Sequence, residues 1–452
     1  MARTSLEAAI DRAGSPVELL RNSSARPHLF PVAPEFTNWR SEQRAWRTSC
    51  VLFDQSHHMT DLYLRGPGAL RLLTDFGVNS FAGFTPGKAK QYVAVNADGQ
   101  FIGDAILFYL EDELFDVVGH PTVANWLQYN VEAGGYDVRL ERDENSADRP
   151  AGPPLMYRYE LQGPSALAVV EAVTGRRLPD VKFFTMTQFS IAGRRVRALR
   201  HGMAGQPGFE IFGPWADGAD VLAAVLEAGR EFGIVRAGAK AYSTANLESG
   251  WIPTVVPAIF GPELKGYREW LDASALGSLG GSMDAADIAG YYVTPYDIGY
   301  GRTVRFDHDF LGRDALQRIA DGPHRAKVTL VWHPDDVAAA VRSLCEPGGA
   351  LPAKFIEWPK ARYAFFQVDK VLLDGAAAGL SLDLGYIANE RAFVSLATVD
   401  AAASEPGTQV TVLWGEEPNS AKPAVERHRQ TGIRATVAPA PYVAEVRAAY
   451  RS

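Results

Sequence analysis

Helical and strand-like segments alternate through most of the chain, and this alternation limits the fold more than any other feature. Apolar residues recur at helical spacing in Ser5–Asn22, Gly66–Phe76, Val123–Gly134, Ser165–Thr174, Ala216–Phe232 and Arg313–Ile319. Strand-type patterns occupy Gln91–Asn96, Ile106–Tyr109, Leu114–Val118, Tyr157–Leu161, Val196–Leu199 and Phe209–Phe212. The mixed order predicts helices packed on sheets. No GxGxxG follows a strand, and GxxxxGK before Ser or Thr is absent, so nucleotide-binding folds of these types are not expected.

Two breaks divide the chain. With 452 residues and 47% hydrophobic content, it is long enough for two or three domains. The segment Asp143–Pro154 is polar and contains Gly and Pro, and a second break lies near Gly322–Arg325. Beyond it, short strands alternate with turn signals at Lys327–Trp332, Ala364–Val368, Phe393–Val399 and Gln409–Leu413. We predict mixed α/β domains at residues 1–150 and 151–322 and an all-β domain at residues 323–452.

Charge and cysteine content exclude several classes of partner. The net charge is −8 and no basic run occurs, which disfavours nucleic acid and anionic membranes as partners. Cys50 and Cys345 are the only cysteines, so neither a disulfide framework nor a thiolate zinc site is expected. The segment Met1–Arg21 predicts a helix and not a signal peptide, and no apolar run has membrane-spanning length. These features predict a cytoplasmic protein.

The segment Phe53–Leu64 carries the most unusual polar cluster of the chain. Leu62 and Leu64 fit a half-buried strand, but the preceding Gln55-Ser56-His57-His58 is not needed for one. Imidazole exchanges a proton near neutral pH, so the cluster can orient and protonate a small substrate. The alternative is that one histidine is a hydrogen-bonded core residue and the other is solvated.

Further short motifs follow this cluster in a fixed order along the chain. They are Leu161-Gln162-Gly163-Pro164, Gly205-Gln206-Pro207-Gly208-Phe209-Glu210-Ile211, Leu247-Glu248-Ser249-Gly250-Trp251, Thr294-Pro295, Gly301, Phe310–Leu316, Gly385-Tyr386, Ser395-Leu396-Ala397 and Gly407-Thr408. Together they resemble the folate-dependent aminomethyltransferase family of the glycine-cleavage T-protein type. With Pro34–Trp39, Tyr242-Ser243 and Glu248–Pro253, the histidine cluster resembles the tetrahydrofolate-dependent aryl O-demethylases, which act on vanillate and syringate.

The resemblance implies an α+β fold in which three domains form a ring. Two α/β domains and a C-terminal β-barrel would surround a central channel for tetrahydrofolate. Five positions match the family's folate site: Gln91, Val118, Gln162, Glu210 and Trp251. Glu210 would bind the donor edge of the pterin, because a carboxylate accepts such hydrogen bonds. Three of these residues have structural alternatives: Glu210 as an exposed strand-end residue, Gln162 as a helix cap and Trp251 as core filling.

The same resemblance assigns the chemistry to Tyr242, His58 and Gln55. Transfer of an aryl methyl group to N5 of tetrahydrofolate is helped by a proton donor to the ether oxygen. Tyr242 matches the demethylases' catalytic tyrosine, and His58 and Gln55 would position it and the substrate hydroxyl. The alternative for Tyr242 is a phenol at a domain junction. No metal is expected, because no metal-ligand spacing such as HExxH occurs.

Two departures from the family bear on the substrate. The loop Gly99–Asp104 lacks one glycine and one aspartate of the aminomethyltransferase pattern, so glycine-cleavage activity is not expected and the role of Asp104 stays open. Vanillate-type members hold the carboxylate with a tyrosine and an arginine, where this chain has His28 and His120. With Phe30 and His57, these residues form the predicted substrate site. The two histidines favour syringate over vanillate, with 3-O-methylgallate also possible.

The predicted function is therefore a tetrahydrofolate-dependent O-demethylase of a methoxylated aromatic acid. One alternative is another enzyme of the family, an aminomethyltransferase or a sulfonium demethylase. The other is a non-catalytic folate-binding protein like the iron–sulfur assembly members, whose Lys-Gly-Cys signature is absent here. Neither motifs nor composition specify an oligomeric state.

Overall fold

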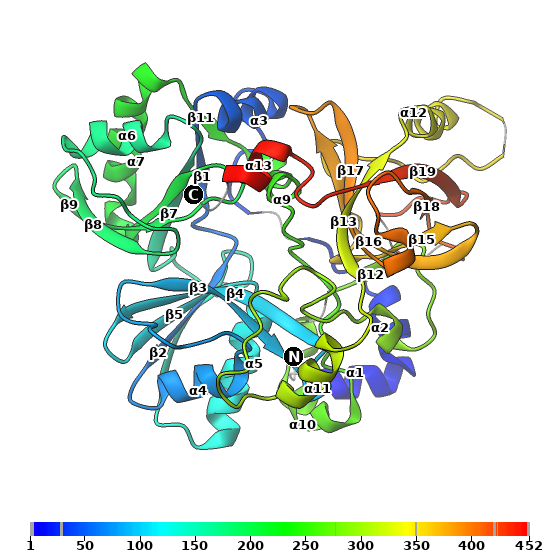
Figure 1. Cartoon of the computed structure of the whole chain (residues 1–452), viewed down its shortest axis with the longest axis horizontal. Helices are drawn as coiled ribbons and strands as arrows, with labels where there is room; N and C mark the ends of the chain where they lie inside the picture. The colour runs from blue at the N-terminus through cyan, green and yellow to red at the C-terminus, as the bar shows by residue number, and fades with distance from the viewer. Residues whose placement is uncertain are drawn as a thin grey trace.

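The computed structural model describes residues 4–27, 30–275, 277–348, 350–418, 422 and 424–449. Its strands form two open sheets and a closed barrel, together with one two-stranded pair. Figure 1 shows these as three lobes arranged around a common centre, with the barrel in yellow to red. Four helices lie beside the five-stranded sheet and below the barrel in this view: α1 (Leu6–Ala13), α2 (Pro16–Arg21), α10 (Lys265–Trp270) and α11 (Arg313–Ala320).

The N-terminal segment forms two helices instead of the single helix predicted over Ser5–Asn22. Helix α1 spans Leu6–Ala13 and α2 spans Pro16–Arg21. Gly14 ends α1 in the left-handed region, with φ of 89°, and Pro16 begins α2 as its first residue. A proline lacks the N–H that a continuous helix would need there, so the single-helix prediction was wrong for a local reason.

The five-stranded sheet is antiparallel throughout, in the order β3-β4-β5-β2-β6. Its strands are β2 (Thr60–Arg65), β3 (Ala89–Val95), β4 (Phe101–Glu111), β5 (Leu114–Gly119) and β6 (Arg139–Asp143). Helix α5 (Pro121–Gly134) contacts β2, β4 and β5, and α4 (Ala69–Phe76) packs on α5. Leu62 and Leu64 of β2 are fully buried beneath them, as their alternation predicted.

The six-stranded sheet has the order β11-β1-β7-β10-β9-β8. Its strands are β1 (Cys50–Asp54), β7 (Met156–Gln162), β8 (Met186–Ile191), β9 (Arg194–Arg200), β10 (Gly208–Pro214) and β11 (Ile234–Ala237). Helices α6 (Ala166–Thr174) and α7 (Gly218–Gly229) contact each other and this sheet. Strand β1 belongs here although the chain next builds the other sheet, so the backbone passes from one sheet to the other directly after β1. The division at residue 150 stays a prediction, and it would place β1 apart from its sheet.

The C-terminal strands close into a barrel of order β13-β17-β16-β15-β18-β19. They are β13 (Ala326–Trp332), β15 (Asp369–Leu373), β16 (Ala376–Ile387), β17 (Ala392–Val399), β18 (Gln409–Trp414) and β19 (Thr431–Ala438). The strand predicted over Ala364–Val368 is shorter, as β14 (Phe366–Gln367), and pairs with β12 (Leu279–Gly280) outside the barrel. Three barrel strands were not predicted from the sequence: β15, β16 and β19.

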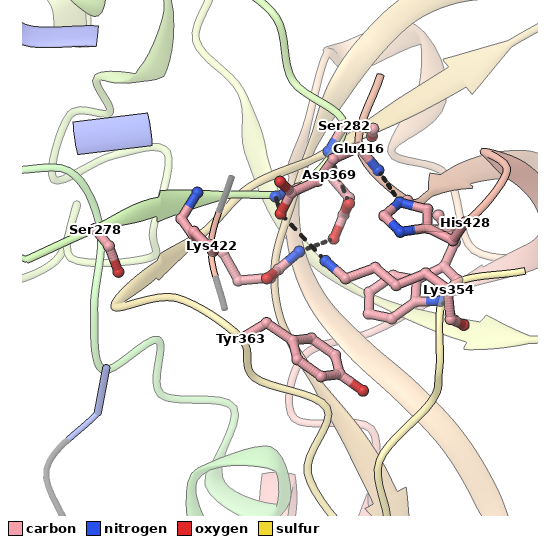
Figure 2. Close-up of polar contacts among 12 residues, drawn as sticks. Ser278, Ser282, Lys354, Tyr363, Asp369, Glu416, Lys422 and His428 are labelled. Atoms are coloured by element: carbon pink, nitrogen blue, oxygen red, sulfur yellow. Dashed lines mark hydrogen bonds and ion pairs between the residues drawn. The ribbon is translucent and has the colours of Figure 1, made fainter. Parts of the chain in front are cut away.

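A buried charged cluster joins the barrel to the rest of the molecule (Figure 2). Lys354 and Glu416 are fully buried and lie 3.3 Å apart, and the backbone N–H of Glu416 donates to His428 Nε2 at 2.7 Å. Lys422 donates to the carbonyl of Arg21 at the end of α2, at 2.7 Å. Because buried charges need such partners, these contacts fix how the barrel docks on the N-terminal helices.

Candidate active site

The segment between β1 and β2 crosses from one open sheet to the other and carries the predicted histidine cluster. Its backbone is fixed to β7. The N–H of Gln55 donates to the carbonyl of Arg158 at 2.9 Å, and the hydroxyl of Ser56 donates to the same carbonyl at 3.3 Å. The cluster therefore lies at the junction of the two sheets.

Tyr242 ends the short helix α8 (Ala239–Tyr242), whose start is held by a buried carboxylate. Glu42 of α3 (Trp39–Thr48) is fully buried and accepts hydrogen bonds from the N–H groups of Phe36 and Gly238, at 2.7 and 2.9 Å. Gly238 directly precedes α8. A buried polar group is tolerated when hydrogen-bond partners surround it, so Glu42 fixes the loop and the helix that present Tyr242.

Tyr242 and His58 form a hydrogen-bonded pair, with Oη 2.6 Å from Nε2. Burial, together with the smaller effects of the His57 and Arg158 charges, lowers the pKa of His58 to about 4. Burial also raises the pKa of the Tyr242 phenol well above its usual value, and the charges of Glu160 and Glu210 act in the same direction. At neutral pH the pair is therefore an uncharged imidazole beside a protonated phenol, which is the state needed for proton donation.

Gln55 lies beside this pair, so the three residues predicted to carry the chemistry meet in space. Its amide nitrogen donates to the carboxylate of Glu160 and to Met203 Sδ, the latter at 3.1 Å. Tyr242 Oη also donates to Met203 Sδ, at 3.3 Å. Glu160 and Met203 were not singled out from the sequence. A charged residue within a predicted strand was the sequence signal that could have identified Glu160. Met203 lies in a turn, and its residue type gave no such signal.

Glu160 organises the polar contacts beneath the pair. It is fully buried and accepts hydrogen bonds from Gln162 Nε2 at 2.5 Å and from the N–H of Met203 at 2.9 Å. His201 Nδ1 lies 3.5 Å away, and hydrogen bonding and charge from Glu160 raise the pKa of His201 against the effect of burial. Gln162 Oε1 in turn accepts from the N–H of Ala204 at 2.7 Å. Gln162 thus holds a turn and does not cap α6, whose N-cap has no side-chain hydrogen bond.

Glu210 is buried on β10, so the alternative of an exposed strand-end residue was wrong. Its Oε1 accepts from Arg158 Nη1 at 3.0 Å, and its Oε2 lies 4.0 Å from His201 Nδ1. Arg158 also contacts the carboxylates of Asp61 and Asp116. Burial raises the pKa of Glu210, and the Arg158 charge opposes this. Because three carboxylates share the Arg158 guanidinium, Glu210 can still accept a hydrogen bond from a further donor.

Two other predicted folate residues converge on Asp104. Its Oδ2 accepts from Gln91 Nε2 at 2.6 Å, from Trp251 Nε1 at 3.0 Å and from Tyr300 Oη at 2.5 Å. Burial raises the pKa of Asp104, while these three donors lower it. Trp251 is half-buried and hydrogen-bonded, so it does more than fill core. Tyr300 was missed, although it directly precedes the Gly301 motif.

Val118 is buried on β5 and belongs to an apolar cluster with Ala89, Phe108, Leu199 and Phe212. This cluster links the two open sheets, because Leu199 and Phe212 come from β9 and β10. A role of Val118 at the folate site stays a prediction.

Phe30, one of the predicted substrate residues, lies against the His58 ring of the pair. Its ring centre is 5.9 Å from that of His58, in an edge-on arrangement. His57 points to other partners: Nδ1 lies 2.8 Å from Ser146 Oγ, and the ring is 5.6 Å from that of Trp215. The structure therefore separates the two neighbouring histidines, and only His58 contacts Tyr242.

His120 is exposed at the start of α5. Its Nδ1 lies 2.8 Å from Thr122 Oγ1, and its ring centre is 6.3 Å from that of Phe365. His28 lies outside the described residues. The placement of both histidines beside a substrate carboxylate stays a prediction.

Two properties of the described part of the chain concern metal binding and membrane spanning. It contains no group of three His, Cys, Asp or Glu side chains arranged to hold a metal ion. Within the same residues, no helix is long and apolar enough to cross a membrane.

Comparisons with known proteins identify the family. The family model described as the GCVT N-terminal domain matches residues 20–255. The chain is 45% identical to syringate O-demethylase of a Sphingobium species, over 99% of this chain and 97% of that protein. It is 32% identical to sesamin methylene transferase of a Sinomonas species, over 85% and 84% of the two chains.

A solved structure confirms the predicted fold class. Glycine cleavage system aminomethyltransferase T from Bartonella henselae superposes with a TM-score of 0.62 at 19% identity, covering 94% of this chain and 96% of that one. The α+β fold of the T-protein type with its C-terminal six-stranded barrel is therefore as predicted. With a family match over more than half of its length and a relative 45% identical across nearly all of it, the chain belongs to the GCVT aminomethyltransferase family.

Proposed function

We propose that this protein is a tetrahydrofolate-dependent O-demethylase of methoxylated aromatic acids, with syringate as the favoured substrate. The products would be 5-methyltetrahydrofolate and a phenol. The observation that carries the proposal is the neutral Tyr242–His58 pair, 2.6 Å apart at the junction of the two open sheets. The 45% identity to syringate O-demethylase over nearly the whole chain supports the same substrate class.

The residues of the pair suit the breaking of an aryl ether. When the O–CH₃ bond breaks, its electron pair stays on the phenolic oxygen, and a proton placed there lowers the barrier. Tyr242 carries its proton at neutral pH, as an ordinary phenol does, and burial raises its pKa further, so it is the proposed donor. His58 is uncharged and holds the hydroxyl of Tyr242 in place. Gln55 Oε1 is buried and without a hydrogen-bond partner in the described part of the chain, so it can accept the substrate's free hydroxyl.

The folate-site residues present groups that fit tetrahydrofolate. The pterin edge offers donors, and Glu210 is a buried carboxylate whose Oε1 pairs with Arg158 and whose Oε2 lies 4.0 Å from His201 Nδ1. Asp104, Gln91 and Trp251 form a second polar group, which would face another part of the cofactor. Tetrahydrofolate supplies N5, the amine that takes the methyl group. The protein's part is to hold the two reactants in line and to exclude water.

A substrate panel tests the proposal. Syringate, vanillate, 3-O-methylgallate, a methylenedioxy aromatic and a sulfonium compound are each incubated with and without tetrahydrofolate, and products are separated by chromatography. We expect phenol release from the methoxylated acids only when tetrahydrofolate is present, and unchanged turnover with a chelator. Phenol release without folate, or turnover of the sulfonium compound alone, would overturn the proposal.

A further inference from the structure

Met203 is the one thioether in contact with the catalytic pair, within the described residues. Its Sδ lies 3.3 Å from Tyr242 Oη and 3.1 Å from Gln55 Nε2. Two backbone hydrogen bonds hold the turn that carries this sulfur. The N–H of Met203 is bound by the buried carboxylate of Glu160, and the next N–H, of Ala204, is bound by Gln162.

The hydroxyl of Tyr242 has one proton and, among the contacts described for it, two neighbouring groups that can accept this proton, His58 Nε2 and Met203 Sδ. Neutral His58 carries its proton on either Nδ1 or Nε2. With the proton on Nδ1, Nε2 is an acceptor and binds the Tyr242 proton. With the proton on Nε2, His58 donates to Oη, and the Tyr242 proton points to Met203 Sδ. Only this second arrangement leaves the proton free to move to a substrate.

We infer that Met203 is a positioning residue that turns the Tyr242 proton away from His58 and toward the substrate. This inference rests on the proposed demethylase function. A thioether is a weak acceptor, so the ether oxygen of a bound substrate readily replaces it. A strong acceptor in place of Met203 would keep the Tyr242 proton, and an apolar residue there would leave this proton bound to His58.

The proton balance is consistent with this role. The ether loses CH₃ and gains H at oxygen, while the amine loses H and gains CH₃. Tyr242 gives its proton to the phenolic oxygen and takes up the proton that the amine releases, so it ends the reaction protonated, and neither an oxidant nor a reductant is needed. Met203 takes no part in bond breaking and only selects the direction of the hydroxyl.

Two substitutions separate this role from simple packing. Met203→Leu conserves volume and removes the acceptor. Met203→Gln has similar length and adds a strong acceptor. Met283→Leu and Met283→Gln, at a half-buried methionine packed in a separate apolar core, are the matched controls. Single-turnover rates report the chemical step and separate it from binding.

We expect the single-turnover rate to decrease from wild type to Met203→Leu and further to Met203→Gln, with about a tenfold loss for the Gln variant. KM should stay within a few-fold of the wild-type value. The loss should shrink for methoxybenzoates bearing electron-withdrawing substituents, whose more acidic phenols need less protonation. The Met283 variants should keep the wild-type rate and the wild-type dependence on phenol acidity.

Equal rates in wild type and both Met203 variants would overturn the inference, and so would a loss that does not depend on phenol acidity. If Met203→Gln does not fold, the Leu variant decides by the same dependence. Failure of the proposed function is distinct, because wild-type protein would then release no phenol from any ether of the series.

Discussion

Tyr242 and His58 are 184 residues apart in the sequence, yet their side chains share a hydrogen bond of 2.6 Å. The pair exists because the chain leaves the six-stranded sheet after β1, places His58 at the crossing and returns to the same region through α8. Both side chains are largely removed from water, so the imidazole is held neutral and the phenol stays protonated.

Replacing Tyr242 with phenylalanine removes the proposed proton donor and little else. We expect turnover to fall by about 10²–10⁴-fold, the range of general acid contributions, with folate affinity nearly unchanged. Steady-state kinetics and calorimetric titration of tetrahydrofolate measure the two effects. Tyr363→Phe, in the apolar core of the barrel, is the matched control, because its hydroxyl contacts only local backbone among the contacts described for it, donating to the carbonyl of Phe355 and accepting from the N–H of Glu357. A Tyr242→Phe enzyme within a few-fold of wild type would assign the phenol to packing.

Replacing Glu210 with glutamine keeps its shape and removes its charge. We expect tetrahydrofolate binding to weaken by roughly 1.5–3 kcal/mol, the size of a hydrogen bond to a charged group, with a smaller effect on the aromatic acid. Calorimetric titration of each ligand separates the two. Because Glu210 also pairs with Arg158, equal losses for both ligands would indicate that the carboxylate acts through the ion pair and not by direct contact.

Replacing His120 with arginine tests which group faces the carboxylate of the substrate. Arginine is a fixed cation with a bidentate fork, and histidine is neither at neutral pH. We expect the ratio of kcat/KM for vanillate over syringate to rise by about tenfold, the scale of one modest contact. Thr122→Val, which removes the hydroxyl beside the His120 ring, is the control for a change in loop conformation. An unchanged ratio with both activities retained would place His120 away from the aromatic ring.

The sequence predicted the sheets better than the contacts between them. Periodicity located strands such as β3 and β10, because their apolar residues alternate locally. It missed β16, whose Ala- and Gly-rich start has little alternation and which is defined by pairing with β15 and β17. The candidate site likewise contains residues that local sequence motifs identify and residues that only the folded contacts identify. The motifs included Tyr242, His58 and Gln55, but Glu160 and Met203 matter only because β7 and the turn between β9 and β10 pass beneath these residues.

The pH dependence of the free energy of unfolding tests whether the His58 ring is removed from water and neutral in the folded protein. Its folded-state pKa of about 4 is below the ordinary value of 6.5, so on acidification the unfolded chain binds this proton first. The contribution of His58 to stability is therefore constant above pH 6.5 and decreases as the pH falls toward 4. Between about pH 7 and about pH 4.5, we expect a loss of about 2 kcal/mol in wild type that His58→Gln does not share. Urea unfolding of both proteins across this range measures the difference, and His333→Gln, a half-exposed residue before α12 (Pro334–Ser343), is the control. Parallel pH profiles for wild type and His58→Gln would mean that the ring is solvated, and would remove the reason for treating the Tyr242 pair as neutral.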